Sequence, residues 1–294
     1  MYWVAAIPVL LGAALAFCEA GAVSIQRTGG FLVAAVLIIA WLNLSNDFFD
    51  SETGVDENKN ESVVNLTGKP NMVFLTSLAF LGVGVGLLGW LLAGSGAHQS
   101  AVLLAAAIAC GYVYQGPPFR LGYIGLGEPL CFLAFGPLAV QAFSLALRPQ
   151  VFQHAVFSAA SWWTSILVGL TTTMVLFCSH FHQLEGDRAV GKMSPIVRLG
   201  STGKAHHVLR WSVFSVFVMA ATGVFLGHLP WTVVAVLPFC TPQARALLAF
   251  AAKHYSNPER IRPLKLYALN LHSALGLALA VALAASRVKL QLGI

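Results

Sequence analysis

The sequence contains little charge for its length. Only 10% of its 294 residues are Asp, Glu, Lys or Arg, whereas 57% are hydrophobic, and the mean hydropathy is +0.76. Because average soluble domains carry roughly 25% charged residues, this composition excludes an ordinary soluble globular domain. The net charge of +6 is not gathered on a basic face outside the loops between apolar runs, so we expect no nucleic-acid partner.

The sequence also lacks paired cysteine motifs, alternating strands and a basic leader. Five cysteines fall within apolar runs, without CxxC spacing: Cys18, Cys110, Cys131, Cys178 and Cys240. We interpret them as small apolar packing residues and expect neither a disulfide framework nor a structural zinc site. The apolar runs are continuous, which excludes the alternation of a membrane β-barrel and indicates helices. Without a basic leader, we interpret the first run as a helix and not as a cleaved signal.

Long apolar runs recur along the chain. A helix needs roughly 20 apolar residues to cross a bilayer, and nine runs of this kind are present. They cover residues 2–22, 30–49, 72–93, 100–115, 128–147, 159–181, 207–227, 231–251 and 265–286. The sequence therefore predicts an all-α, multi-pass integral membrane protein with nine transmembrane helices.

The basic residues are distributed unevenly between the two sides that nine spans would create. Ten Lys and Arg residues fall in the connections after the second, fourth, sixth and eighth runs, against four on the opposite side. Because cytoplasmic loops carry the excess of Lys and Arg, we expect these four connections to be cytoplasmic.

The end of the second run carries a dense acidic segment. Six of the eleven carboxylates lie close together: Asp47, Asp50, Glu52, Asp56, Glu57 and Glu61. In a continuous helix, Asn43, Asn46, Asp47 and Asp50 would share one face. Mg²⁺ prefers oxygen ligands and commonly bridges substrate phosphates, so this face is a candidate magnesium site. The alternative is a solvated helix end.

A second polar segment follows the sixth run. His180, Gln183 and Asp187 are spaced i, i+3 and i+7, like Asn43, Asn46 and Asp50 in the first segment, which predicts another shared helical face. Two such faces four runs apart suggest two related four-helix halves, plus one helix, around a central cavity. His180 and His182 would lie on different faces of a helix, so we do not interpret them as a zinc pair.

Cationic residues accompany both acidic segments and could bind a diphosphate, although inside-positive topology alone would also account for them. These are Lys69, Arg120, Arg188 and Lys192. The Pro- and Gly-rich segment 112–128 ends the fourth run sharply. We expect it to leave five polar residues at the cytoplasmic surface: Tyr114, Gln115, Arg120, Tyr123 and Glu128. For Tyr112 or Tyr123 alone, an aromatic belt at the membrane interface is the simpler interpretation.

Together these segments resemble the UbiA superfamily of intramembrane aromatic prenyltransferases, along nearly the whole chain. The resemblance rests on Asn46-Asp47-x-x-Asp50 with Asp56, on the Tyr112–Glu128 run, and on His180-Phe-His-Gln183 with the following Asp187-Arg and Gly-Lys pairs. The first two are similar to the naphthoate branch, and the third is similar to its phylloquinone-pathway form. Most members carry an aspartate where this chain has Gln183, which leaves Asp187 as the only aspartate of the second motif.

The resemblance implies one domain over residues 1–294 and roles for the residues above. Mg²⁺ would be held by Asn46, Asp47, Asp50, Asp56, Gln183 and Asp187. The diphosphate would be bound by Lys69, Arg120, Arg188 and Lys192. The acceptor or cavity would be lined by Asn43, His180 and His182, and Tyr114 would stabilise the allylic cation. Asp50, Asp187 and Tyr114 would be catalytic.

The implied activity is Mg²⁺-dependent transfer of a phytyl or other polyprenyl group from its diphosphate to a naphthoate-type aromatic acceptor, with loss of CO₂. The active site would face the cytoplasm, in a plasma, inner or thylakoid membrane. Two alternatives remain: a related enzyme with homogentisate or a chlorophyllide as acceptor, and a membrane carrier, which also places carboxylates at a cavity between repeated halves.

Overall fold

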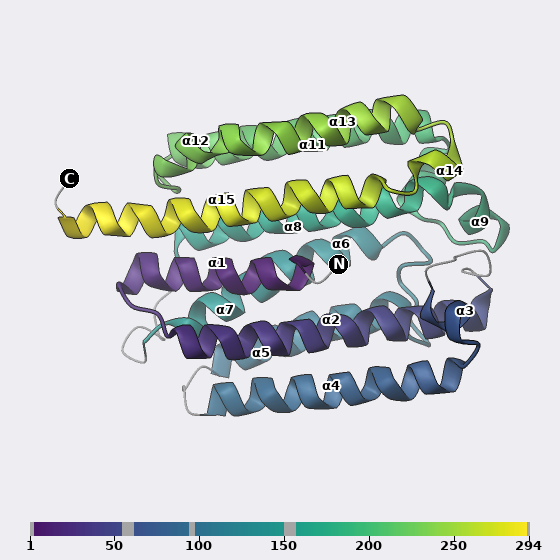
Figure 1. Cartoon of the computed structure of the whole chain (residues 1–294), viewed down its shortest axis with the longest axis horizontal. Helices are drawn as coiled ribbons and strands as arrows, with labels where there is room; N and C mark the ends of the chain where they lie inside the picture. Colours follow the sequence, from purple (N-terminus) through teal and green to yellow (C-terminus); the bar gives the residue numbers. More distant parts are fainter. Residues whose placement is uncertain (1–2, 55–61, 94–97, 150–156, 293–294) are drawn as a thin grey trace.

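The structure is a computed structural model that describes residues 3–54, 62–93, 98–149 and 157–292, and its elements there are all helical (Figure 1). In chain order they are α1 (Trp3–Ala20), α2 (Ile25–Thr53), α3 (Val63–Thr67), α4 (Pro70–Ala93), α5 (His98–Gln115), α6 (Gly127–Leu133), the π-helical turn η1 (Ala134–Leu138), α7 (Ala139–Leu147), α8 (Ala159–Ser179), the 3₁₀ turn η3 (His180–His182), α9 (Leu184–Ala189), α10 (Pro195–Leu199), α11 (Thr202–Phe225), α12 (Thr232–Val236), the 3₁₀ turn η4 (Leu237–Cys240), α13 (Thr241–His254), α14 (Pro258–Ile261) and α15 (Leu264–Leu292). The expected all-α class is confirmed.

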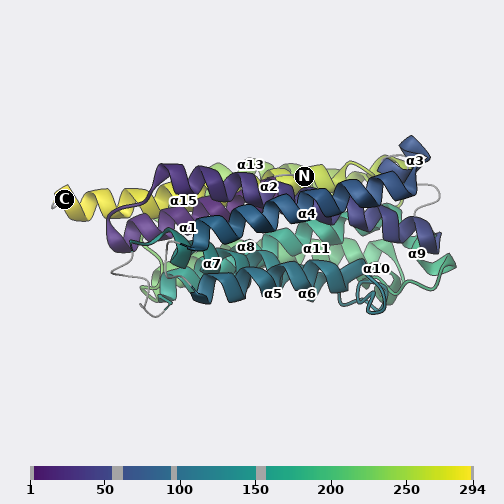
Figure 2. The same cartoon turned by 90° about the horizontal axis from the view of Figure 1, so that it is seen from below.

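The axes of the long helices are nearly parallel in both views, and the short helices α3 and α9 lie at one end of them (Figures 1 and 2). Within the described part of the chain, eight helical runs are long and apolar enough to cross a membrane. The ninth expected span is present as α5, but its ends are polar, and the count of nine is not confirmed.

The core is divided into two hydrophobic clusters that meet at α1 and α7. One face of α1, with Ile7 and Leu11, packs into a cluster shared with α8, α11 and α15. Another face, with Ala5 and Val9, packs into a cluster shared with α2, α5 and α7. Since α1 is buried on both faces, it joins the two groups of helices; whether these groups are related halves stays a prediction.

α2 carries the first polar face on one unbroken helix. The Ser24 hydroxyl caps its start by accepting a hydrogen bond from the Arg27 amide at 3.2 Å. The helix ends at Gly54, whose φ of 73° lies in the left-handed region that glycine adopts without strain. Residues 43–50 therefore lie on one continuous helix, as expected, and their shared face is confirmed.

α6 and η1 approach α8 unusually closely at two glycines. A side chain at Gly136 would place its Cβ 2.5 Å from the Ser165 carbonyl oxygen and 2.8 Å from the Gly169 Cα. Pro137 lies inside the π-helical turn, where its missing N–H suits a widened helix. This close contact brings the start of α6 against the end of α8, where the second polar segment begins.

The second polar segment is not the continuous helix that its spacing predicts. α8 ends at Ser179, the 3₁₀ turn η3 follows, and Gln183, with φ −99° and ψ 0°, separates η3 from α9. The shared helical face of His180, Gln183 and Asp187 was therefore a wrong prediction. A tighter turn advances the chain differently from an α-helix, so the spacing does not place these three side chains on one helical face.

Candidate active site

A cavity of about 560 Å³ opens between the two groups of helices. Its walls come from α1, α2, α3, α5, α6, η1, α8 and η3, together with Gln183, Lys192 and Lys265. Nine of the residues predicted from sequence line it: Asn43, Asn46, Asp47, Asp50, Tyr114, His180, His182, Gln183 and Lys192. The two polar segments, more than a hundred residues apart, therefore face one space. His180 and His182 both line it, contrary to the different faces expected for a helix.

The first cluster comprises Asn43, Asn46, Asp47 and Asp50. Asp50 is only 4% exposed, and the Gln115 amide nitrogen donates to both of its carboxylate oxygens at 2.8 Å. The Asp47 Oδ2 accepts a hydrogen bond from the Val63 backbone amide at 2.9 Å. Burial of a carboxylate is costly unless donors compensate it, and these donors hold both side chains at the cavity wall.

Tyr123 connects the first cluster to the opposite wall. Its hydroxyl donates to Asp50 Oδ1 at 3.0 Å and also bonds to the Thr53 hydroxyl. The Lys192 ammonium lies 5.6 Å from its ring centroid and the Arg120 guanidinium 5.8 Å. Desolvation by burial, and then the negative charge of Asp50, raise the pKa of the Tyr123 phenol. The phenol therefore stays protonated and remains a hydrogen-bond donor at neutral pH.

The backbone of the Tyr123 loop is bonded to the segment that carries Lys192. The Met193 amide donates to the Tyr123 carbonyl at 2.7 Å. The Arg198 guanidinium donates to a backbone carbonyl in each of the two segments, that of Met193 at 3.2 Å and that of Ile124. These bonds fix Tyr123 and Lys192 relative to each other.

The second cluster comprises His180, His182, Gln183, Asp187 and Lys192. Asp187 is only 1% exposed, and its Oδ1 lies 3.5 Å from the Lys192 ammonium, which is also buried. Its other oxygen has no hydrogen-bond partner among the described residues. His180 Nδ1 lies 3.1 Å from a carboxylate oxygen of Glu128. The cavity is lined by Lys192 but not by Asp187.

The remaining predicted residues lie outside the cavity lining. Arg120 pairs with Glu52 at 3.4 Å beside Tyr123 and has a left-handed φ of 42°, which is strained for a residue with a side chain. Arg188 pairs with Glu185 at 3.4 Å, and its side chain is 49% exposed. Lys69 is exposed just before α4. Asp56 lies outside the described residues.

Two residues expected at the surface are instead buried parts of the site. Gln115 is 3% exposed and Glu128 is 8% exposed. Tyr123, for which a membrane-interface role was the simpler interpretation, contacts Asp50. The signal available in the sequence was the position of Gln115 and Glu128 next to apolar runs, where a polar side chain needs a partner. Their partners lie 65 and 52 residues away, so the local pattern could not name them.

The donors of the first cluster suit a hard divalent cation. Asn46, Asp47 and Asp50 supply an amide oxygen and two carboxylates to one cavity wall. In the described part of the chain, no three His, Cys, Asp or Glu side chains are close enough to form a complete metal site. The second cluster offers a Gln183 side chain and one carboxylate that is already paired with Lys192. The chain's own ligands therefore fit a cation that substrate oxygens help to hold, on the α2 side.

Comparison with known proteins shows the family of the chain. Residues 5–271 match the model of the UbiA prenyltransferase family. The chain is 43% identical to the chloroplastic 2-carboxy-1,4-naphthoquinone phytyltransferase of Arabidopsis thaliana over 98% of this chain and 75% of that protein. It is 44% identical to the 2-carboxy-1,4-naphthoquinone phytyltransferase of a Synechocystis strain, over 95% of this chain and 89% of that one.

Solved structures share the fold at low identity. A UbiA homologue from Archaeoglobus fulgidus bound to GPP and Mg²⁺ superposes with a TM-score of 0.57 and 17% identity, covering 95% of this chain and 96% of that one. A digeranylgeranylglyceryl phosphate synthase gives a TM-score of 0.59 and 16% identity, covering 96% and 93%. The family model matches most of the chain, the two phytyltransferases are similar over almost all of it, and the fold agrees, so the chain belongs to the UbiA prenyltransferase family.

Proposed function

We propose that the protein is a Mg²⁺-dependent prenyltransferase of quinone biosynthesis. It would transfer a phytyl group from phytyl diphosphate to a carboxylated naphthalene ring, with release of diphosphate and CO₂. The observation that carries this proposal is the cavity itself, which has acidic oxygens on one wall and Lys192 on the other. The two phytyltransferases that are 43% and 44% identical support the donor and acceptor classes.

The mouth of the cavity would hold the diphosphate. Asn46, Asp47 and Asp50, together with Asp56, would ligate Mg²⁺, which supplies positive charge for the leaving diphosphate. Lys192, which faces the cavity and lies beside Tyr123, would contact the remaining oxygens. Arg120 at the edge of the mouth, and Lys69 and Arg188 farther out, would attract the anion before it enters.

The chemistry follows from the charge distribution. The bond between the allylic carbon and the diphosphate oxygen breaks, and its electron pair leaves with the diphosphate. The ring carbon that bears the carboxylate attacks the cation, and the electrons of the carbon–carboxylate bond then restore aromaticity as CO₂ departs. An electron-rich dihydroxynaphthoate is the suitable nucleophile, because a quinone ring is electron-poor.

The apolar walls would protect the allylic cation from water. Tyr114 lines the cavity and would place its ring near the cation. Asn43, His180 and His182 also line it and would position the acceptor; Glu128 fixes the orientation of the His180 ring. Asp187 would act by holding Lys192.

The proposal is tested with membranes that contain the full chain. They are supplied with Mg²⁺, phytyl diphosphate and dihydroxynaphthoate, and prenylated product and CO₂ are followed by mass spectrometry. Asp50→Ala should reduce the rate by at least about 10²-fold, because it removes a charged group from the leaving-group site. Glu259→Ala is the matched control, since it removes an exposed carboxylate paired with Arg262 on α14. Absence of product with the unmodified chain, or equal rates for both variants, would contradict the proposal.

A further inference from the structure

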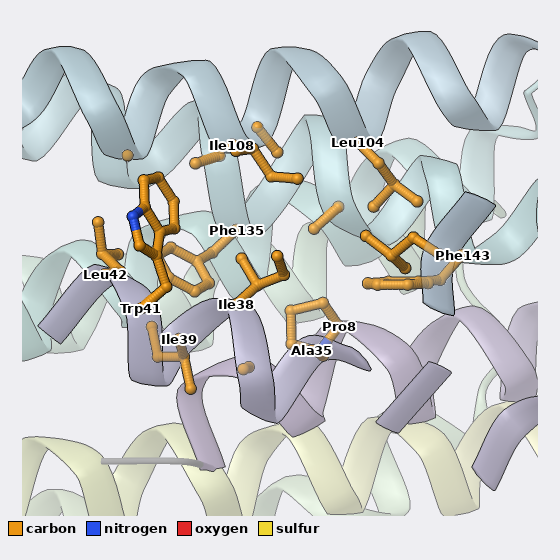
Figure 3. Close-up of a pocket in the computed structure, with 16 residues that line it drawn as sticks. Pro8, Ala35, Ile38, Ile39, Trp41, Leu42, Leu104, Ile108, Phe135 and Phe143 are labelled. Atoms are coloured by element: carbon orange, nitrogen blue, oxygen red, sulfur yellow. The ribbon is translucent and has the colours of Figure 1, made fainter. Parts of the chain in front are cut away.

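A second cavity of about 90 Å³ adjoins the first one on the side away from the diphosphate mouth. Its sixteen lining residues carry no charged side chain and come from α1, α2, α4, α5, η1 and α7 (Figure 3). Five residues line both cavities: Ile39, Leu42, Gly111, Ala134 and Phe135. The apolar cavity therefore borders the active-site cavity along these shared residues.

Leu42, which lines both cavities, and Phe143 lie at opposite ends of this second cavity (Figure 3). In Figure 3, Leu42 lies at one end, and Phe143 and Leu104 lie at the other. Phe143 is nine residues beyond the shared Ala134, and Leu104 is seven residues from the shared Gly111, in the direction away from Gln115. Phe143 and Leu104 thus mark the deep end of the combined space.

The deep end is rigid. Phe143 is 4% exposed and packs edge-to-face on Phe31, with ring centroids 5.6 Å apart. On its other side, a side chain at Gly12 of α1 would come within 2.5 Å of the Phe143 Cβ, so the two backbones are already in close contact. Tightly packed aromatic rings move little, so they leave no space for further atoms of a bound chain.

The depth suits an isoprenoid chain of intermediate length. Ala35, which lines the second cavity, precedes Asp50 by fifteen residues on the unbroken α2, a distance of about 22 Å along the helix axis. An extended phytyl or geranylgeranyl chain, with its diphosphate at Asp50, reaches this level. A chain longer by one or more isoprene units would meet Phe143.

We propose that the second cavity receives the end of the prenyl donor, and that Phe143, together with Leu104, sets the maximum chain length. This inference rests on the proposed function and adds the residues that select the donor. Truncating Phe143 would open room for one more isoprene unit, whereas filling the cavity from α5 would exclude the last unit. The two substitutions should therefore shift donor preference in opposite directions.

The test compares donors of increasing length with one acceptor, using the full chain in membranes. Farnesyl, geranylgeranyl, geranylfarnesyl and hexaprenyl diphosphates are supplied, and kcat/KM is measured for each. Phe143→Ala should raise the geranylfarnesyl to geranylgeranyl ratio by roughly tenfold or more, and Leu104→Ala should raise it less. Ala107→Phe, which fills the cavity, should raise the farnesyl to geranylgeranyl ratio by roughly tenfold.

Controls separate selection from loss of stability. Phe177→Ala removes a buried ring that packs on Phe181 and lines neither cavity. It should leave every donor ratio unchanged. If Phe143→Ala does not fold, Phe143→Leu should show the same direction of change at smaller size.

The possible failures are distinguishable. Product from the unmodified chain, with unchanged donor ratios in the folded Phe143, Leu104 and Ala107 variants, would overturn the chain-length inference alone. A change of the same size in Phe177→Ala would also overturn it. No product from any donor with the unmodified chain would overturn the proposed function, and the inference with it.

Discussion

The two clusters at the cavity mouth stabilise their carboxylates with different partners. Asp50 on α2 receives hydrogen bonds from an amide, Gln115, and a phenol, Tyr123. Asp187 on α9 lies beside an ammonium group, that of Lys192, at 3.5 Å. Among the contacts of the described residues, the carboxylate on α2 thus has two neutral donors, whereas the one on α9 has a cationic partner.

This difference indicates that the two sides of the cavity mouth bind ions of opposite charge. The α2 side presents the side-chain oxygens of Asn46, Asp47 and Asp50 to the cavity, which suits a divalent cation. The α9 side presents Lys192, whose own counter-ion is held behind the wall, and this suits an anion. Gln183, a neutral amide that lines the cavity on the same side, agrees with a second side that relies less on carboxylates. We therefore expect the cation on α2 and the direct anion contact at Lys192.

The largest effect is expected from breaking the Asp187–Lys192 pair. Lys192→Met leaves the almost fully buried Asp187 without its counter-ion, which should cost about 3–5 kcal/mol of folding free energy. The double variant Asp187→Asn/Lys192→Met removes both charges and should recover most of that stability. Thermal unfolding in detergent measures both.

Diphosphate binding then separates the structural role of Lys192 from its proposed contact. Inorganic diphosphate with Mg²⁺ should bind the stable double variant at least about tenfold more weakly than the unmodified chain, because a charged hydrogen bond is missing. Unchanged binding in the double variant would show that Lys192 serves only to neutralise Asp187.

A smaller effect is expected from removing the hydroxyl that links the clusters. Tyr123→Phe keeps the ring between Arg120 and Lys192 but removes the donor to Asp50. It should lower kcat/KM by roughly tenfold, the value of one hydrogen bond to a charged group, and weaken activation by Mg²⁺. Tyr112→Phe is the control, because the Tyr112 hydroxyl donates only to the Pro117 carbonyl among the described contacts. Equal losses in both variants would assign Tyr123 a purely structural role.

The comparison also shows what the sequence could and could not predict. The first cluster was predictable because α2 continues unbroken to Thr53, so helical spacing places Asn43, Asn46, Asp47 and Asp50 together. The second was not, because a 3₁₀ turn at His180 interrupts the helix.

Contacts between segments far apart in the sequence could not be predicted either. The bonds of Gln115 and Tyr123 to Asp50 join residues 65 and 73 positions apart. Periodicity reports the face of one helix and not its partner. Eight of the expected spans were predictable in place, since bilayer thickness sets their length, although helices such as α2 and α15 continue past the expected ends.

The smallest effect is expected from making the second side resemble the first. Gln183→Asp adds a carboxylate to the cavity wall opposite α2 and restores the aspartate that most of the superfamily carries. Because Gln183 is half-buried and solvent screens its field, the gain for a cation should be roughly 1 kcal/mol, or about a fivefold lower Mg²⁺ concentration at half-maximal rate. Gln183→Glu, with a longer side chain, and Gln99→Glu, exposed at the start of α5 outside both cavities, test whether position or charge alone matters. A fivefold lower Mg²⁺ requirement in the position 183 variants only would show that a cation can bind on this side even though Lys192 is nearby. No gain would mean that the Asp187–Lys192 pair already excludes one.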